Sequence, residues 1–352
     1  MKKLLPLALI LITASIQNAA ACTSFGLVSK TGTIIAKNSD YYYDIQSVEI
    51  LAPNKQFALW YDNTYGNNFK VFAQMANNNV KMGINEAGLT AMEEDPLLPK
   101  DRNHRRYIQP VGGTAECMTL WGILQNFKTV DQLVPYINDV FSHASPNHYE
   151  VADAHKILVV EVAYGDDDMT TTRKFSYKIL NRPGEYYTHT NTYQDPKFVH
   201  LNSLADKYLV SGAEARNLKI KGLLMGNNQN ESAILSWLLN TSSSAKNPNN
   251  KNWCLGTSLF RSNLGNRTEI DNNTLHPNAY GTVASMFVFN NGIPQNIHVV
   301  IRLIDKIKVD SNGNQTIYYK EATATLPTLF QSKYTFTEKK FTRNAPVNSV
   351  CK

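Results

Sequence analysis

The order of strand and helix patterns along the chain is the feature that most constrains its fold. Alternating apolar residues predict strands up to residue 92, then a pair of helices, more strands, three helical stretches and a last group of strands. Each sheet and each helix must bury an apolar face, so this order is typical of two sheets packed together between two helical layers. The predicted fold class is therefore α+β, an αββα sandwich.

The predicted elements have the following bounds. Strands are expected at Thr23–Val28, Thr33–Asn38, Ser47–Ala52, Lys70–Ala76, Val80–Ile84, Leu89–Met92, Ile157–Ala163, Lys174–Leu180, Glu185–Thr190, Thr282–Phe289 and Ile297–Leu303. Helices are expected at Thr114–Phe127, Val130–Phe141 (capped by Thr129), Leu201–Leu209, Gly212–Met225 and Glu231–Leu239. Asn85–Gly88 reads as a hairpin turn, and no linker or repeat divides residues 22–352, which are predicted to form one domain.

The first 21 residues have the three parts of a secretory signal peptide. They begin with a basic Met1–Lys3, continue with an apolar Leu4–Ile12 and end with the small residues Ala19–Ala21. Cleavage after Ala21 would make Cys22 the first residue of the mature chain. We therefore expect an exported protein, periplasmic or secreted, that begins with a cysteine.

An N-terminal cysteine carries a thiol and a free α-amine on one residue. The amine, with a reference pKa near ~8, can take the thiol proton, so nucleophile and general base come from Cys22 alone. Two other interpretations stay open: a chance cysteine at the cut, and a lipoprotein acylated on Cys22. Against the lipoprotein, Ala19 stands where a branched apolar residue is usual, and a strand follows at Thr23–Val28 in place of a polar tether.

A short polar segment, Lys37-Asn38-Ser39-Asp40, ends the strand that pairs with the one after Cys22. The hairpin returns this segment to the neighbourhood of Cys22. Asp40 could then accept a hydrogen bond from the α-amine, and the charge of Lys37 could lower the pKa of the thiol. We expect these effects to cancel in part and to leave no extreme pKa. The alternative is an ordinary surface turn.

These pieces resemble the cysteine N-terminal-nucleophile hydrolases of linear amides, which include choloylglycine hydrolases, penicillin V acylases and related dipeptidases and acyltransferases. The resemblance runs from residue 22 to about 195. It rests on Cys22-Thr23, Lys37–Asp40, Asn85–Leu89, Ala152-Asp153 with Val159–Glu161, and Thr190-Asn191. It implies an αββα fold in which Cys22 attacks a small-molecule amide and forms a thioester. It also implies that Asp40 lies beside the α-amine and that Asn191 stabilises the oxyanion.

Three departures leave the substrate open. The penicillin and bile-salt branch has Arg in place of Lys37, and Lys lacks the planar fork of Arg. Asp95 stands where that branch has Asn or Tyr, and a carboxylate would oppose an oxyanion. Glu94 and Asp95 could instead bind the free amine of a dipeptide, as a dipeptidase requires. Arg261 and Arg267 are equal candidates for a pocket arginine.

Other features exclude several kinds of function. A net charge of +6 on 352 residues indicates solubility and gives no sign of nucleic-acid binding, and the Arg102–Arg106 cluster reads as a solvated loop. No later segment is apolar over the roughly 18 residues of a membrane span. Cysteine and histidine lack metal-ligand spacing, so no metal or cofactor is expected. Cys254 and Cys351 could form a disulfide, Cys117 reads as a buried thiol, and a homo-oligomer stays open.

Overall fold

The structure is a computed structural model, and it describes most of the chain after residue 21. The described residues are 22–42, 46–52, 68–76, 79–97, 119–163, 173–226, 230–238, 270–271, 274–275, 280–310 and 315–343. The predicted signal peptide, the Arg102–Arg106 cluster, Arg261, Arg267, Cys117, Cys254 and Cys351 lie outside them. Cys22 is the one cysteine that the described ranges contain, and it is a free thiol.

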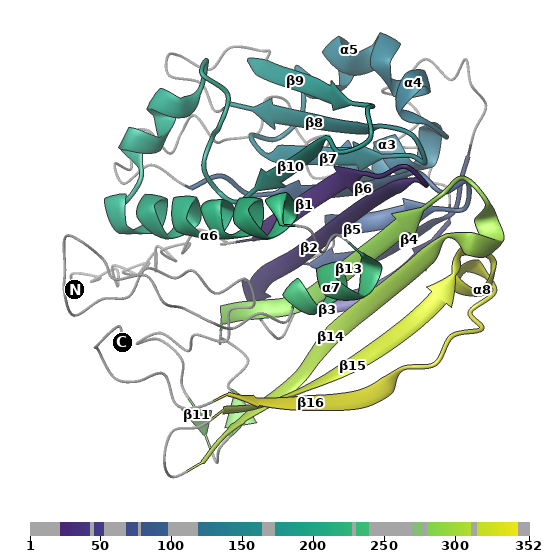
Figure 1. The fold of residues 1–352 in the computed structure, drawn as a ribbon, viewed down its shortest axis with the longest axis vertical. Coiled ribbons are helices and arrows are strands. Elements are labelled where there is room, and N and C mark those ends of the chain that lie inside the picture. The colour runs from purple at the N-terminus through teal and green to yellow at the C-terminus, as the bar shows by residue number, and fades with distance from the viewer. Residues whose placement is uncertain are drawn as a thin grey trace, which may run out of the picture.

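Two antiparallel sheets form the centre of the molecule (Figure 1). The first sheet runs, in spatial order, β10 (Tyr186–His189), β1 (Thr23–Val28), β2 (Thr33–Tyr42), β13 (Tyr280–Asn290), β14 (His298–Val309), β15 (Gln315–Thr325) and β16 (Thr337–Arg343). The second runs β3 (Gln46–Leu51), β4 (Val71–Ala76), β5 (Asn79–Asn85), β6 (Thr90–Glu94), β7 (His148–Ala152), β8 (Ile157–Val162) and β9 (Phe175–Leu180). A short ladder joins β11 (Ile270–Asp271) to β12 (Thr274–Leu275).

The described helices cover the outer faces of the two sheets, apart from α8 (Leu326–Phe330), whose Leu326 and Leu329 join the apolar cluster between the sheets. They are α3 (Thr119–Asn126), α4 (Val130–Leu133), α5 (Ile137–Phe141), α6 (Lys207–Met225), α7 (Glu231–Trp237) and α8, with 3₁₀ turns at Val134–Tyr136, Val199–Leu204 and Pro294–Asn296. Apolar residues of α3 to α5 pack on the β3–β9 sheet, whereas those of α6 and α7 pack on β1, β2, β13 and β14. A third apolar cluster lies between the sheets. These three interfaces make the predicted αββα sandwich.

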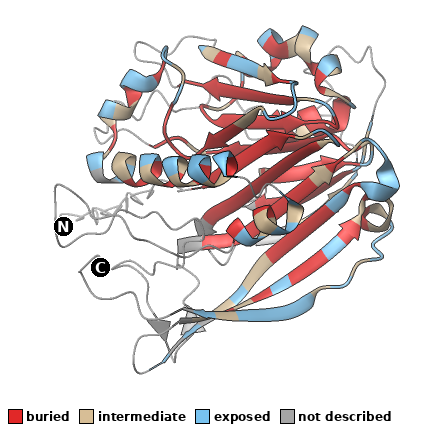
Figure 2. Cartoon of the chain, viewed as in Figure 1, coloured by how far each residue is buried: buried red, intermediate tan, exposed pale blue. Residues whose placement is uncertain are grey.

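The side chains between the sheets change character along the strands. On β2 and β6 the apolar Ile35 and Met92 belong to the central core, and the next inward-facing positions are Lys37 and Glu94. On β1 the inward-facing positions run from the apolar Val28 through Gly26 to the polar Ser24. The same change occurs on β7 and β8, which end at the candidate site with buried charged residues. Figure 2 shows that the strands here are buried throughout. One end of the intersheet layer is therefore apolar and the other is polar.

Most predicted strands are present, and the differences have local causes. The predicted helix at 130–141 is interrupted by a 3₁₀ turn, because Pro135 has no N–H to donate within a helix. Thr129 caps α4 as predicted, accepting from the Gln132 N–H at 3.3 Å. The predicted helix 201–209 is a 3₁₀ turn followed by the start of α6 at Lys207.

Strand β7 was not predicted, because two of its buried positions are the charged or polar His148 and Glu150. The predicted hairpin turn between β5 and β6 is confirmed. Asn85 Oδ1 accepts from the N–H groups of Ala87 and Leu89, and Asn85 Nδ2 donates to Leu124 and Phe127 carbonyls of the α3 region at 2.7 and 2.8 Å. Gly88 adopts φ +96°, which favours glycine at this position.

Candidate active site

Cys22 lies at the start of β1, the strand held between β10 and β2. Its side chain is 4% exposed, and its Sγ lies 4.0 Å from the backbone carbonyl of Asp40. The hairpin of β1 and β2 pairs Thr23 with Asn38 and Ser24 with Lys37, so the polar segment returns to Cys22 as predicted. The thiol and the segment are therefore neighbours inside the protein.

The segment Lys37–Asp40 is buried in the middle of a sheet. All four residues are at most 1% exposed, so the alternative of a surface turn is wrong. Thr282 of β13 donates to Asp40 Oδ1 at 2.6 Å, and Ser285 donates to Asn38 Oδ1 at the same distance. Strand β13, which lies more than 240 residues away in sequence, therefore orients the carboxylate and the amide of this segment.

Lys37 extends from β2 across the gap between the sheets. Its ammonium donates to the backbone carbonyl of Glu93 and, at 3.2 Å, to that of Lys81. A buried ammonium is stabilised by such acceptors even without a carboxylate in direct contact. The amine of Lys37 is thus held as a fixed donor on the second sheet, near the thiol.

The electrostatic surroundings of the thiol are stronger than the sequence analysis expected. Burial raises the pKa of Cys22 to about 12; the positive charge of Lys37 acts in the opposite direction, and the carboxylates of Glu94, Asp40 and Asp95 add to the increase. The predicted effect of Lys37 is therefore present, but it does not cancel burial. In this environment the thiol is neutral at neutral pH and needs a base to remove its proton.

Asn191 follows the end of β10 and is completely buried. Its Nδ2 donates to the backbone carbonyl of Asp95 at 2.7 Å, and its Oδ1 accepts from the guanidinium of Arg216 at 3.1 Å. Its own carbonyl accepts from Leu97 N–H at 2.8 Å. The side chain is consequently held in one orientation from both of its ends.

Arg216 is the functional candidate that the sequence analysis missed. It lies on α6, is 3% exposed, and contacts Asn191 across the edge of the first sheet. Its helix carries no motif that distinguishes it from Arg182 or the other arginines, and the two predicted pocket arginines lie outside the described residues. The signal that the sequence offered is spacing, because Arg216 falls between Ala213 and Ile220 on the buried face of α6.

Glu94 and Asp95 end β6 in different surroundings. The carboxylate of Asp95 is 33% exposed and lies 3.4 Å from Lys81 Nζ, so the backbone carbonyl of Asp95 and not its carboxylate contacts Asn191. Glu94 is 0% exposed and lies between the sheets, with Oε2 3.5 Å from His189 Nδ1. Their substrate-binding roles stay predictions, and both carboxylates already have cationic neighbours.

A cluster of buried polar side chains continues from Glu94 between the sheets. Ser24 donates to Glu150 at 2.9 Å, and burial raises the pKa of Glu150 to about 8. His189 lies 3.0 Å from Glu161. Besides Glu94, only Glu161 of these residues was predicted from the sequence. A single acid or histidine within a strand pattern does not indicate which side chains of the opposite sheet it will contact.

Metal-ligating atoms come together in two groups of described residues. His148, Glu161 and His189 form one group and Glu94, Glu150 and His189 the other, each with ligand atoms within 4.8 Å of one another. The rings of His148 and His189 are stacked, with centroids 3.9 Å apart and planes inclined by 35°. Two histidines on one ion direct their nitrogens towards it from different sides, which keeps their rings further apart. The stacked geometry fits a histidine pair better than two ligands of one ion.

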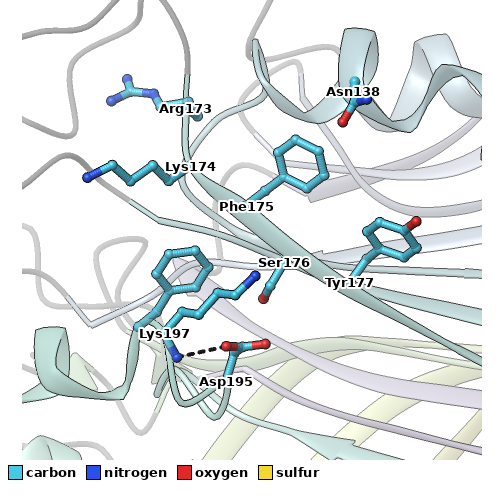
Figure 3. Close-up of a pocket in the computed structure, with 9 residues that line it drawn as sticks. Asn138, Arg173, Lys174, Phe175, Ser176, Tyr177, Asp195 and Lys197 are labelled. Carbon is cyan, nitrogen blue, oxygen red and sulfur yellow. Dashed lines mark hydrogen bonds between the residues drawn. The ribbon is translucent and has the colours of Figure 1, made fainter.

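A separate cavity of about 660 Å³ lies at β9, the edge strand of the second sheet (Figure 3). Its lining includes basic Arg173 and Lys197 and aromatic Phe175 and Tyr177. The lining shares no residue with the Cys22 site. It is linked to that region through Asp195, whose backbone N–H donates to Glu161 at 3.0 Å, and through Ser176, which pairs with Glu161 between β9 and β8.

The fold and site together define the class of this protein. Two antiparallel sheets between helical layers, with a buried cysteine opening the first strand between two others, are the architecture of the N-terminal-nucleophile hydrolases. The sequence matches the family described as acyl-coenzyme A:6-aminopenicillanic acid acyl-transferase over residues 28–262, more than half of the chain, and the chain belongs to this family. This confirms the predicted resemblance and the prediction of an enzyme that acts on linear amides.

Solved structures give weaker likenesses. Penicillin V acylase from Agrobacterium tumefaciens is 12% identical with a TM-score of 0.44, covering 80% of this chain and 83% of its own. An N-acylethanolamine-hydrolyzing acid amidase orthologue from Caenorhabditis elegans is 15% identical with a TM-score of 0.45, covering 78% and 94%. A conjugated bile acid hydrolase mutant from Clostridium perfringens is 11% identical with a TM-score of 0.43, covering 92% and 97%. Likenesses of this size do not assign a substrate.

Two further results concern related sequences and the helices of this chain. No curated protein sequence matches this chain. Within the described part of the chain, no helix has both the length and the apolar character that crossing a membrane requires.

Proposed function

We propose that this protein is an exported hydrolase of linear amides in which Cys22, freed by cleavage after Ala21, is the nucleophile. The single observation that carries the proposal is the position of Cys22. Its thiol is buried at the start of β1, beside the carbonyl of Asp40 and within the field of Lys37. A thiol in these surroundings needs a base, and the α-amine created by cleavage would be the nearest one available.

The proposed reaction has two steps. The Cys22 thiol gives its proton to its own α-amine, and the sulfur forms a bond to the amide carbonyl carbon. The C–N bond then breaks, the ammonium proton passes to the leaving amine, and a thioester remains. Water adds to the thioester with the same amine as base, which releases the carboxylic acid and restores the thiol.

Three neighbours have proposed roles in these steps. Asp40, oriented by Thr282, is placed to hold the α-amine. Lys37 contributes positive charge that favours the thiolate. Asn191 would polarise the carbonyl oxygen through its amide, which Arg216 keeps facing the site by binding its oxygen.

The structure offers less support for the two alternatives. A dipeptidase needs a carboxylate for the free amine of its substrate, and Glu94 and Asp95 already lie against His189 and Lys81. A lipoprotein needs a tether after its acylated cysteine, whereas β1 begins at Thr23 and Cys22 itself is buried. We therefore favour hydrolysis of an amide whose acyl group carries no free amine.

The test begins with the mature protein. Mass spectrometry of the exported chain is expected to find an unmodified N-terminal Cys22, and a diacylated cysteine would contradict the proposal. A panel of phenoxyacetyl amides, long-chain acyl amides, bile-salt conjugates and dipeptides, followed by amine release, would then identify the substrate class.

Two variants test the nucleophile itself. Cys22→Ala is expected to abolish amine release while keeping the fold, because so small a side chain at the chain start contributes little to the core. A verified chain that keeps Met before Cys22 is expected to be equally inactive, because an amide nitrogen cannot act as the base. Full activity of that Met-Cys protein would reject the N-terminal-nucleophile mechanism.

A further inference from the structure

Two rows of side chains face each other between the sheets beside the proposed active site. The rows follow from strand pairing: His189 pairs with Ser24 and Ser24 with Lys37 on the first sheet, and Glu94 pairs with His148 and His148 with Glu161 on the second. All six residues are buried. His189 is the member of the first row that contacts the second row at three places.

The contacts of His189 define its charge. Nδ1 lies 2.7 Å from the backbone carbonyl of Thr190, which can only accept a hydrogen bond, so Nδ1 carries a proton. Nε2 lies 3.0 Å from Glu161 Oε1. If Glu161 is ionised, Nε2 carries a proton as well, and the ring is a cation.

The carboxylate of Glu161 is held as a hydrogen-bond acceptor by the backbone at both of its oxygens. Its Oε1 also accepts from the Gln194 N–H at 2.8 Å, and its Oε2 accepts from the Asp195 N–H at 3.0 Å. Backbone donors of this kind stabilise the charged form of a carboxylate. His189 therefore lies as a cation between two acids, Glu161 and Glu94.

These contacts enclose the loop that carries Asn191. His189 donates to Thr190, the residue before Asn191, while Glu161 binds the backbone of Gln194 and Asp195 after it. The His189–Glu161 pair thus holds both ends of a short loop whose central side chain is the proposed oxyanion donor. A shift of about 1 Å in such a donor can cost on the order of 100-fold in rate.

We propose that His189, as a buried cation, is a positioning residue of the reaction centre: with Glu161 it clamps the loop of Asn191, and it neutralises Glu94. This inference rests on the proposed function. Burial raises the pKa of Glu94 and the His189 cation acts in the opposite direction, while an ionised Glu94 opposes deprotonation of the nearby thiol.

The other groups that face His189 are consistent with its charge. Burial opposes a charge on the ring, but the hydrogen bonds to Glu161 and Glu94 raise the pKa of His189 to about 10. Burial and the charge of His189 lower the pKa of the stacked His148. Glu150 and Lys37 complete the set of neighbouring titratable groups. A neutral ring stacked on a cationic one avoids like-charge repulsion.

The first experiment needs no variant. In mature protein labelled with ¹⁵N at histidine, NMR at pH 8 is expected to show one imidazole that is protonated on both nitrogens. His148, the other described histidine beside Glu94 and Glu161, has a lowered pKa and should be neutral at this pH. A spectrum with only neutral imidazoles at pH 8 would overturn the proposal, and this result does not depend on whether Cys22 is the nucleophile.

The second experiment separates positioning from simple stability. His189→Gln keeps a donor towards Glu161 but removes the charge, and it is expected to lower kcat about 100-fold with little change in KM. His200→Gln, at an exposed histidine of the 199–204 turn, is the matched control and should match wild type.

The double variant Glu94→Gln/His189→Gln removes both charges and tests their coupling. It is expected to recover kcat about tenfold over His189→Gln, the size of an ordinary coupling between contacting groups. A kcat of His189→Gln equal to that of His200→Gln, or a double variant no better than the single one, would overturn the proposal. Activity that survives Cys22→Ala would instead reject the proposed function.

Discussion

The layer of side chains between the two sheets is apolar at one end and charged at the other, although β-strands supply the side chains at both ends. At one end Ile35, Met82 and Val299 form a dry core, in which every packed side chain contributes to stability. At the other end β2, β6 and β8 present Lys37, Glu94 and Glu161, which are also buried. Burying charge is unfavourable unless each group is paired, so the polar end costs stability that the apolar end must supply. The fold alone does not require a polar end, whereas the chemistry that we propose at Cys22 does.

The strongest test of this comparison uses neighbouring inward positions of β2. Lys37→Met keeps the length of the side chain but removes the cation that favours the thiolate. We expect amide hydrolysis to fall by at least about 100-fold, the loss typical of a removed electrostatic group in an active site. The free energy of unfolding should hold or rise, because a buried charge has been replaced by an apolar chain. Rates and urea midpoints on the same sample measure both.

The matched change at the apolar end is Ile35→Ala, two residues away on the same strand. Ile35 is 1% exposed in the central core, so the cavity should lower the free energy of unfolding by about 2–5 kcal/mol. The rate per folded molecule should stay close to wild type. If Ile35→Ala lost activity as Lys37→Met does, the two ends would not be separate in function.

The next largest effect concerns the clamped amide. Asn191→Ala should lower kcat by about 100- to 1,000-fold if Asn191 is an oxyanion donor. Arg216→Met leaves the donor but removes the contact that orients it, so we expect a smaller loss of about tenfold, equal to ~1.4 kcal/mol. Steady-state kinetics decide: a change confined to KM in either variant would assign that residue to substrate binding.

A third prediction follows from pH. The pKa of His189 is raised to about 10, so its stabilising contribution is complete below its unfolded pKa near 6.5 and is lost as pH rises through 10. Glu150, raised to about 8, loses its contribution between pH 4.5 and 8, and Cys22 loses its contribution between 9 and 12. Stability should therefore fall with rising pH. Urea midpoints of His189→Gln should decline less than wild type between pH 6.5 and 10, and parallel curves would contradict this.

The smallest effect is expected at the surface. Lys156 and Asp131 form an ion pair at 2.5 Å that is 29% and 66% exposed. Lys156→Met should change the free energy of unfolding by no more than about 0.2–1 kcal/mol, because water screens such pairs.

The buried ion pair of Lys81 and Glu93, whose side chains are 12% and 9% exposed, is the comparison for this surface pair. Lys81→Met should lower the free energy of unfolding by about 1.5–3 kcal/mol. Thermal unfolding in low and high salt compares the two.

The sequence analysis located the parts of the site that lie close together along the chain. Cys22 and Lys37–Asp40 share a hairpin, and hairpin pairing follows from short-range pattern and turn. The Asn85–Gly88 turn and the Thr129 cap were predicted for the same reason. These features depend on residues within a few positions of one another, where local geometry leaves few alternatives.

The same reasoning failed where polar residues replaced apolar ones inside the protein. Strand β7 carries His148 and Glu150 at its inward positions, so its alternation reads as a surface strand or a loop. Arg216 lies on a helix of mixed character, and its partner Asn191 is 25 residues earlier. Within α6 the one sign that Arg216 turns inward is its helical spacing from Ala213 and Ile220.

Most of the order of elements and the hairpin that returns Lys37 and Asp40 to Cys22 were determined by the sequence itself, because each depends on periodicity or on adjacent residues. The pairing of Asp40 with Thr282, the contact of Arg216 with Asn191 and the clamp of His189 and Glu161 were decided only by the tertiary structure. Each joins different strands, or a helix and a loop. Such contacts exist only after the sheets have packed, and the desolvation that gives Cys22 and His189 their unusual pKa values appears in the same step.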